Sequence, residues 1–226
     1  MCCLFGFVDY AGSLSVKQRN RLIRELSIAA EARGTDATGI AYNTSRGLQV
    51  YKRPLAAHRL HLRIPAEARA VMGHTRMTTQ GSAKKNYNNH PFFGHVKEES
   101  FALAHNGVLW NDLELRHAKH LPRTKVQTDS YIAVQLLEQK KSLDFDSLRY
   151  MAEQVEGSFS FTVLDEQSAL WIVKGDSPLS IAYFPERGVY VYASTVEILN
   201  KALTRCGKQL GHRRTVEVEM GDLLKI

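Results

Sequence analysis

Four short apolar runs follow one another in the C-terminal half of this sequence, and they constrain the fold more than any other feature. The runs are rich in β-branched and aromatic residues, as strands are. Turn signals separate them at Asp165-Glu166, Lys174-Gly175-Asp176 and Arg187-Gly188. Short turns between strands are typical of antiparallel pairing. We therefore predict consecutive antiparallel strands at residues 158–165, 169–174, 179–184 and 188–193.

Further strand signals are spread over the rest of the chain. Residues 38–43 and 47–52 form a predicted hairpin that turns near Ser45-Arg46-Gly47. Each of the remaining runs ends in polar residues. These predicted strands lie at residues 3–9, 68–76, 101–107 and 215–225.

Helical periodicity is clearest between Ser15 and Arg33, with Ser15 as the predicted N-cap and Gly34 as the residue that ends the helix. Three more helices are predicted: from Thr128, as N-cap, to about Lys140; from Asp146 to before Gly157; and near residues 195–204. Many antiparallel strands with few helices set aside indicate an α+β fold, with helices packed on sheet faces. No repeat or linker interrupts the pattern, so we expect one domain over residues 1–226.

The composition fits a globular protein, since 44% of the 226 residues are hydrophobic and 23% are charged. No apolar run approaches the length needed to cross a bilayer. Asp9 interrupts the apolar start and no basic residue precedes it, so we expect no signal peptide. The three cysteines are odd in number and two are adjacent, which argues against a disulfide framework and favours a reducing, cytoplasmic compartment.

The formal net charge is +7, and basic residues concentrate in segments 52–63 and 116–125. Such segments are most often solvated surface, although they could meet an acidic partner or nucleic acid. Aromatic and basic residues do not interleave here as they do in RNA-binding proteins. We therefore expect no nucleic-acid partner.

Several familiar motifs are absent from the sequence. It has no GxGxxG after a strand, no GxxxxGK[ST], no HExxH and no pair of CxxC motifs. His117 and His120 stand three residues apart on a predicted helical segment and could share a metal, but no third ligand accompanies them. We therefore expect neither a cofactor nor a metal ion.

The chain opens with MCCLFGFVD, which places Cys2 and Cys3 directly behind Met1. One interpretation is a buried edge strand in which both cysteines act as small hydrophobic residues. The other starts from removal of Met1, which would leave the Cys2 thiol beside a free α-amine. Such an amine titrates near ~7.7–8.0, so it can accept the thiol proton and return it to a leaving group. This stretch alone leaves both interpretations open.

Five polar clusters sit at the ends of predicted elements, and each has a plain structural explanation. Arg33-Gly34 can close a helix, Asn106-Gly107 can form a hairpin turn, and Thr128 with Asp129 can cap a helix. Arg76 can be a surface arginine at a strand end. The clusters read RGTDATG (33–39), GHTRMTTQG (73–81), NNHPF (88–92), AHNGVLWN (104–111) and QTDS (127–130).

Together and in this order, with Cys2 in front, the clusters resemble the class II glutamine amidotransferase domain of the N-terminal-nucleophile hydrolases. That family has CGIFG-like, RGPDxxG, GHTRWATxG, NAHPF, HNGxIxN and TDSE segments. The counterparts here are residues 2–6, 33–39, 73–81, 88–92, 105–111 and 128–131. EGSFSFTVLD at 156–165 is also similar to the family's GAYAFVVLD, so the resemblance covers essentially the whole chain.

The resemblance implies a fold and a reaction. The fold is a four-layer αββα sandwich of mostly antiparallel sheets. The reaction is hydrolysis of the side-chain amide of glutamine through a thioester on Cys2, which releases glutamate and ammonia. The Asn106 side chain and the Gly107 backbone N–H would stabilise the oxyanion of this reaction.

The same resemblance implies how the glutamyl group is bound. The planar guanidinium of Arg76 suits the α-carboxylate, and Asp129 supplies the counter-charge for the α-ammonium. Thr79 and His90 are expected to line the pocket.

Four residues depart from the family pattern. Met77 and Tyr131 stand where tryptophan and glutamate are usual, and Gln80 stands where the sugar-aminating branch often has histidine. These positions tend to lie where the glutaminase half meets the acceptor-binding half. We therefore transfer no sugar, purine or asparagine assignment. Cys3 replaces the usual glycine, and in a strand it would point to the face opposite Cys2 and pack there.

Since the sequence stops at Ile226, we expect no synthase domain to follow, and we expect ammonia to pass to a separate acceptor subunit or to be released. A second hypothesis is a hydrolase of another γ-glutamyl amide. A third, of another class, is a catalytically silent binding or regulatory module. The third is disfavoured because a silent module need not retain Cys2, Arg76, Asn106, Gly107 and Asp129. We expect no membrane partner, and the oligomeric state is open.

Overall fold

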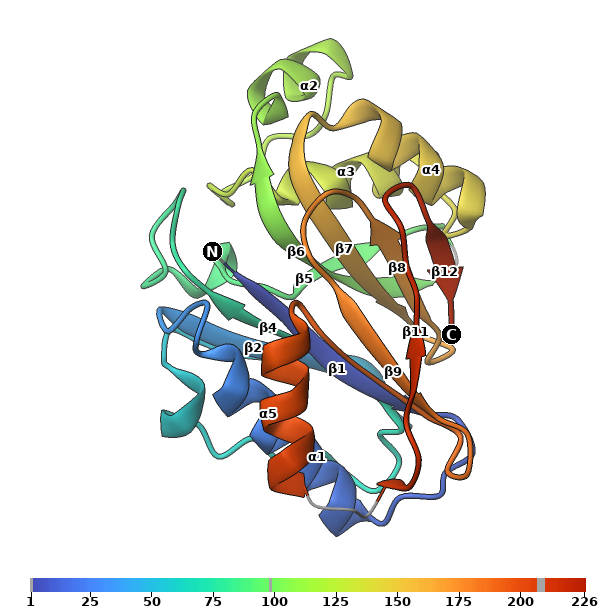
Figure 1. The fold of residues 1–226 in the computed structure, drawn as a ribbon. Helices are drawn as coiled ribbons and strands as arrows, with labels where there is room; N and C mark the ends of the chain where they lie inside the picture. Colours follow the sequence, from blue (N-terminus) through green and yellow to red (C-terminus); the bar gives the residue numbers. More distant parts are fainter. Residues whose placement is uncertain (1, 98, 207–209) are drawn as a thin grey trace.

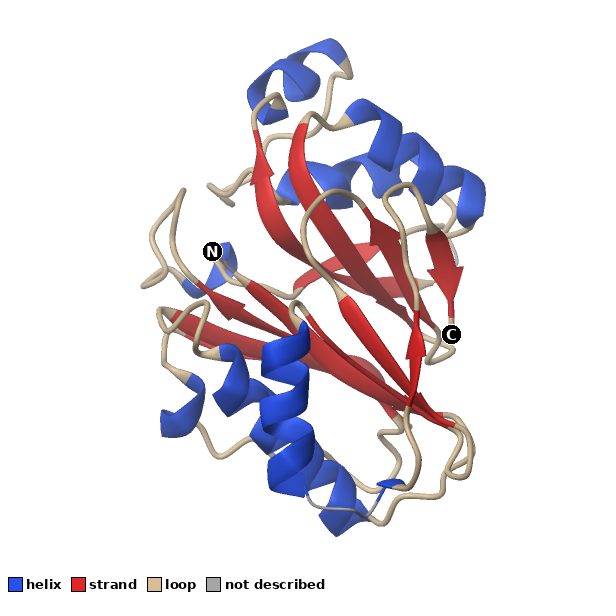
Figure 2. Ribbon diagram, viewed as in Figure 1, coloured by secondary structure: helices blue, strands red, loops and turns tan. Residues whose placement is uncertain are grey.

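The computed structural model describes residues 2–97, 99–206 and 210–226. Two β-sheets pack face to face, and helices cover the outer face of each sheet (Figure 1). Every strand pair within the described residues is antiparallel. The layers alternate as helix, sheet, sheet and helix (Figure 2). The predicted α+β fold of the αββα type is therefore confirmed.

The larger sheet has seven strands in the order β11, β9, β10, β1, β4, β2, β3. The predicted hairpin forms its β2–β3 edge, and Gly47 supplies the positive φ of 88° that the turn requires. In sequence order the strands are β1 (Cys3–Asp9), β2 (Ala37–Thr44), β3 (Gly47–Arg53), β4 (Ala70–Arg76), β9 (Ser180–Phe184), β10 (Val189–Ala193) and β11 (Arg214–Val216).

The smaller sheet has five strands in the order β12, β8, β7, β6, β5. The register of β6 against β7 pairs Asn106 with Ser160 and Gly107 with Phe159, so β6 runs straight through the Asn-Gly pair. The hairpin turn considered for that pair is therefore excluded. The strands are β5 (Phe92–His95), β6 (Ser100–Leu109), β7 (Gly157–Asp165), β8 (Leu170–Lys174) and β12 (Leu223–Lys225).

Two helices cover the larger sheet and two cover the smaller one, with α2 beyond the end of β6 (Figure 1). Ser15 caps α1 through a capping box, because its hydroxyl accepts from the Gln18 amide while the Gln18 side chain accepts from the Ser15 amide. The helices are α1 (Val16–Ala30), α2 (Asp112–Ala118), α3 (Tyr131–Lys140), α4 (Phe145–Gln154) and α5 (Val196–Cys206), with 3-10 turns η1 (Ala57–Arg59) and η2 (Asn86–Asn88).

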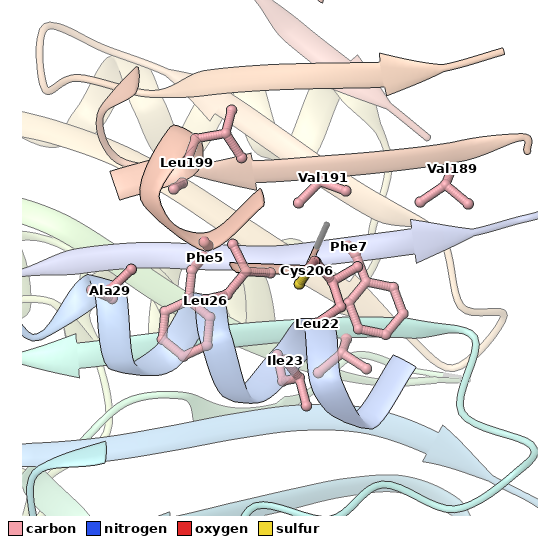
Figure 3. Packing of buried hydrophobic residues seen from close by; sticks show 14 of the residues in the cluster. Phe5, Phe7, Leu22, Ile23, Leu26, Ala29, Val189, Val191, Leu199 and Cys206 are labelled. Carbon is pink, nitrogen blue, oxygen red and sulfur yellow. The ribbon is translucent and has the colours of Figure 1, made fainter. Parts of the chain in front are cut away.

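Strand β1 shows how alternation in the sequence builds two cores. Phe5 and Phe7 point to the side of α1 and α5, where they pack among aliphatic side chains (Figure 3). Leu4 belongs instead to the core between the two sheets. Full burial of each such side chain stabilises the fold by about 1.5–3 kcal/mol. A Cβ at Gly6 would lie 2.2 Å from the Val71 carbonyl oxygen, so glycine is required where these strands meet.

Two predictions about elements were wrong in detail. The single strand expected at 215–225 is two three-residue strands, β11 and β12, which lie in different sheets. Thr128 does not cap α3 with its side chain, because its buried hydroxyl has no hydrogen-bond partner in residues 2–97, 99–206 and 210–226. No helix in the described part of the chain is long and apolar enough to span a membrane.

Candidate active site

The polar clusters of the sequence meet near the start of β1, the end of β4 and the last residues of β6, close to the end of the chain marked N in Figure 1. A small pocket of about 10 Å³ lies there, with room for roughly one water molecule. Its walls are Cys2, Arg76, Met77, Thr79, Gln80, His90, His105, Gly107, Thr128, Asp129 and Ser130. Six of the seven predicted site residues therefore line one pocket, and Asn106 lies directly beside Gly107 in β6.

Cys2 presents its thiol to this pocket. The side chain is half-buried, and Sγ lies 3.6 Å from the Met77 carbonyl oxygen. Arg33 Nε donates to the Cys2 carbonyl at 2.8 Å, which fixes the backbone of the residue. Burial raises the pKa of the Cys2 thiol above its ordinary value. A thiol in this state is mostly protonated at neutral pH, so it needs a base within reach to become a nucleophile.

Cys3 has a different environment. Its side chain is fully buried beneath α1 and α5, in the cluster that holds Phe5 and Phe7. Burial raises the pKa of its thiol to about 11. The structure thus separates the two cysteines, with Cys2 in the pocket and Cys3 in the hydrophobic core.

Asn106 carries a side-chain donor that no described residue uses, and Gly107 has a tightly constrained backbone. Asn106 is 1% exposed, and its Nδ2 has no hydrogen-bond partner among the described residues. A buried donor of this kind costs free energy unless a ligand or water satisfies it. Gly107 has a φ of 146°, and a Cβ there would lie 1.8 Å from the Ser158 carbonyl oxygen. Only glycine therefore fits at position 107, where β6 passes close to the backbone of Ser158 in β7.

Arg76 is buried, with 3% of its surface exposed, and is not the surface arginine of the plain explanation. Its NH1 donates to Asn89 Oδ1 at 2.7 Å, and its NH2 donates to the carbonyl oxygens of Gln80 and Gly81. These bonds hold segment 77–81 over the pocket. Asp36 holds the same segment from outside, because its Oδ2 accepts from the Thr78 amide at 2.7 Å.

Asp129 is 4% exposed, and its Oδ2 accepts from the Leu109 amide at 2.7 Å. Ser130 Oγ donates to its Oδ1 at 3.4 Å. Within the described residues no ion pair joins Asp129 to Arg76, and burial lowers the pKa of Arg76 although the nearby carboxylate opposes that shift. The pocket therefore offers one cation and one anion to a ligand that carries both charges.

Three buried histidines pack at this side of the pocket, where His90 and His105 line it and His74 lies beside them. The His90 ring packs against His74 and Phe92, with centroids 4.2 and 4.4 Å away. His74 Nε2 bonds to the His105 carbonyl, and burial lowers the pKa of His74 to about 3. Burial also lowers the pKa of His90 and of His105. Neither ring nitrogen of His90 has a partner among the residues that the structure describes, so His90 presents a neutral polar ring to the pocket.

Thr79 sits on the exposed part of segment 77–81, at the rim of the pocket. It makes no side-chain hydrogen bond within the described part of the chain. Its place fits a lining role and nothing more specific.

Sequence reasoning missed one residue of this network. Lys52 was taken as part of a solvated basic segment, but its Nζ donates to the carbonyl oxygens of Asn89 and Pro91, on either side of His90. The ammonium also lies 5.0 Å from the centre of the Phe92 ring. Burial and the nearby Arg76 lower the pKa of Lys52 to about 8. No signal in a run of basic residues distinguishes a half-buried lysine that is hydrogen-bonded from its exposed neighbours.

Comparison with known proteins gives consistent results. A family profile described as "Glutamine amidotransferase domain" matches residues 74–201. The glutamine–fructose-6-phosphate aminotransferase of Bacillus spizizenii is 31% identical over 185 residues, which is 78% of this chain and 30% of that protein. The enzyme of the same name from Thermus thermophilus is 33% identical over 173 residues, 74% of this chain and 27% of that protein. The chain thus spans about 30% of the length of these curated relatives.

A solved structure supports the architecture. The glutamine phosphoribosylpyrophosphate amidotransferase from B. subtilis, complexed with ADP and GMP, superposes with a TM-score of 0.73. The match covers 100% of this chain and 47% of that chain, at 20% sequence identity. At this identity the likeness establishes the fold alone.

Proposed function

This chain belongs to the class II glutamine amidotransferase family, and from that premise we propose that it hydrolyses the side-chain amide of glutamine to glutamate and ammonia, with residues 1–226 as one glutaminase domain. Cys2 is the proposed nucleophile. The convergence of Cys2, Arg76, Gly107 and Asp129 on one pocket carries the proposal.

The first chemical step forms a bond between Cys2 Sγ and the amide carbon. The thiol proton passes to the α-amine of Cys2, which is free once Met1, outside the described residues, has been removed. This base is needed because burial raises the pKa of the thiol. The carbonyl π electrons move to oxygen and give a tetrahedral oxyanion.

The oxyanion is stabilised by two donors. Asn106 Nδ2 is buried without a partner, and Gly107 brings its backbone N–H to the pocket wall. Donors that are already in place cost no reorganisation when the charge develops. When the intermediate collapses, the C–N bond breaks, the ammonium proton goes to the leaving nitrogen, and ammonia departs from a thioester on Cys2. Water then attacks the thioester, which yields glutamate and restores the thiol.

The α-carboxylate and α-ammonium of glutamine are proposed to bind Arg76 and Asp129. Both side chains are fixed by hydrogen bonds and are more than nine-tenths buried, so they hold the substrate with little motion. The pocket of about 10 Å³ is smaller than a glutamine side chain. Segment 77–81, whose first four residues are exposed, must therefore shift when substrate binds.

The residues that line the pocket do not identify the acceptor of the ammonia. The relatives are named for transfer to fructose 6-phosphate, and this chain spans about 30% of their length. We propose that ammonia passes to an acceptor-binding part on a separate subunit, and that the reaction takes place in the cytoplasm. The proposal includes no sugar substrate.

Mass spectrometry of protein from its native host tests the proposal. We expect loss of Met1, and a single adduct on Cys2 after treatment with a glutamine-analogue electrophile. Ammonia release from glutamine should accompany the labelling. Release of amine only from a different γ-glutamyl amide would replace glutamine as substrate. Neither reaction, from protein that has lost Met1, would refute the hydrolase and favour a binding module.

A further inference from the structure

Basic residues from two separate segments converge on one groove. The groove has an open volume of about 1140 Å³ and runs along α1, between that helix and residues 58–64. It shares no residue with the pocket at Cys2. Lys17, Arg21 and Arg24 line it from one face of α1, because residues four and seven apart lie on the same side of a helix. Arg63 lines it from the opposite wall.

Three of these cations have no partner in the described part of the chain. The side chains of Lys17, Arg24 and Arg63 are exposed and form neither a hydrogen bond nor an ion pair there. Glu25, the carboxylate of the groove, is already engaged by Arg205 at 3.6 Å. The groove thus presents positive charge that the chain itself does not neutralise.

The groove also has an apolar floor and a fixed wall. Val16, Ile28 and Leu60 contribute aliphatic surface beside the cations. The Asn20 side chain pins the opposite wall to α1, since its Oδ1 accepts from the Ile64 amide at 2.9 Å and its Nδ2 donates to the Ile64 carbonyl at 3.0 Å. A preformed groove loses little entropy when a ligand binds.

We propose that this groove binds an acidic segment of a partner protein that also carries aliphatic side chains. Carboxylates of the partner neutralise Lys17, Arg24 and Arg63, and its aliphatic side chains cover the apolar floor. Nucleic acid fits less well, because no Phe, Tyr or Trp lines the groove to stack on bases. This inference is independent of the proposed glutamine hydrolysis.

The spacing of the cations defines the ligand further. Lys17 and Arg24 are two helical turns apart, which is about 10 Å along the axis of α1. A helical partner segment with carboxylates seven residues apart on one face matches that distance. Leucines that flank those carboxylates, one before the first and one after the second on the same face, would then lie over Val16 and Ile28.

The test is fluorescence anisotropy of the intact chain with a labelled helical peptide that has this arrangement of glutamates and leucines, at physiological ionic strength. The groove variant combines Lys17→Glu, Arg24→Glu and Arg63→Glu. The matched control combines Arg46→Glu, Arg123→Glu and Arg187→Glu, which are exposed positions outside the groove with the same change in net charge. We expect the groove variant to lose affinity by at least about 10-fold and the control by less than about 2-fold.

A second peptide, with serine in place of leucine, separates groove binding from general attraction to a basic protein. It should bind several-fold more weakly to the wild type. Equal losses in the groove and control variants, equal binding of the two peptides, or no binding of either would overturn the proposal. Tighter binding of a single-stranded oligonucleotide that the groove variant abolishes would assign the groove to nucleic acid instead. Unchanged thermal unfolding of both variants shows that a loss of affinity does not come from misfolding.

Discussion

The pocket at Cys2 and the groove along α1 both gather charged residues, but they hold them in different ways. In the pocket, Arg76 is 3% exposed and donates to Asn89, Gln80 and Gly81. In the groove, Lys17 is exposed and unpaired within the described residues. One region is a closed network of polar groups, and the other is an open row of cations in water.

This difference determines what one substitution can do in each region. A buried polar group that loses its partner has no water to replace it, so the cost falls on the whole network. An exposed cation has water as an alternative partner, so its removal changes little unless a ligand is bound. We therefore expect large single-residue effects at the pocket and small, additive effects in the groove. The following predictions test this contrast, from the largest expected effect to the smallest.

The two adjacent cysteines give the largest expected difference. Cys2→Ala should abolish ammonia release from glutamine, because it removes the proposed nucleophile. Cys3→Ala should retain much of the activity, since Cys3 lies in the hydrophobic core and its loss costs stability instead. Ammonia release and thermal unfolding of both variants are the measurements. A block on the N-terminus that cannot be cleaved should act like Cys2→Ala, and full activity of the blocked protein would exclude the α-amine as base.

Arg76→Lys and Asp129→Asn should both impair glutamine hydrolysis strongly. Each leaves one charge of the substrate unmatched in a buried pocket, which typically costs on the order of 2–5 kcal/mol. Lysine does not rescue Arg76, because an ammonium cannot donate at once to Asn89, the 80–81 carbonyls and a carboxylate. Steady-state kinetics should show the loss in kcat/KM. Normal hydrolysis by both variants would disprove the proposed binding of the glutamyl charges.

Asn106→Ala should lower kcat, because it removes one oxyanion donor. The expected loss of transition-state stabilisation is about 2.7–4 kcal/mol. The fold should survive, since Asn106 Nδ2 has no partner within the described residues to lose. Binding of the product glutamate, followed by thermal shift, should stay near the wild-type value. A variant that loses glutamate binding to the same degree as kcat would indicate a structural role for Asn106.

How far the sequence predicts this molecule depends on the kind of interaction. Alternation and helical spacing are local, so β1, the β2–β3 hairpin, α1 and the strands β7 to β10 were predicted within a few residues. The conformation of Asn106-Gly107 is not set by the local sequence. Pairing with β7 keeps β6 extended there, although the sequence favours a turn. The structure of residues 215–225 was also not local, because this segment divides into β11 and β12, which are edge strands of two different sheets.

The site illustrates the same limit. Motif order suggested Cys2, Arg76 and Asp129, although nothing in the periodicity indicates that the start of β1, the end of β4 and the residues before α3 meet. Lys52 escaped notice because its burial depends on residues 86–91, which fold over β3. A basic run in a sequence therefore mixes exposed cations, such as Arg63, with a buried one.

Lys52, which supports the pocket, and Lys17, which lines the groove, test the contrast between the two regions with the same residue type. Lys52→Met should raise KM for glutamine a few-fold, by roughly 1 kcal/mol, because Lys52 holds the Asn89 carbonyl while the Asn89 side chain holds Arg76. The value of kcat should change little, because Lys52 does not contact the reacting atoms. Lys17→Met should leave KM, kcat and thermal unfolding at neutral pH unchanged, as an exposed substitution does. Equal kinetics of the two variants would remove Lys52 from the network that positions Arg76.

The pH dependence of stability gives Lys52 a second readout that a merely space-filling role would not produce. Burial lowers the pKa of Lys52 to about 8, from 10.5 for an ordinary lysine. Between these values the unfolded chain binds more protons at this site than the folded chain, so the Lys52 contribution to the unfolding free energy rises with pH. Below pH 8 both states are protonated and the contribution is constant. The free energy of unfolding of the wild type should therefore increase relative to that of Lys52→Met as the pH is raised from about 8 towards 10.5. Denaturant titrations of both proteins across this window measure the difference, and two curves that stay parallel would mean that Lys52 is not the buried cation that its contacts with Asn89 and Pro91 describe.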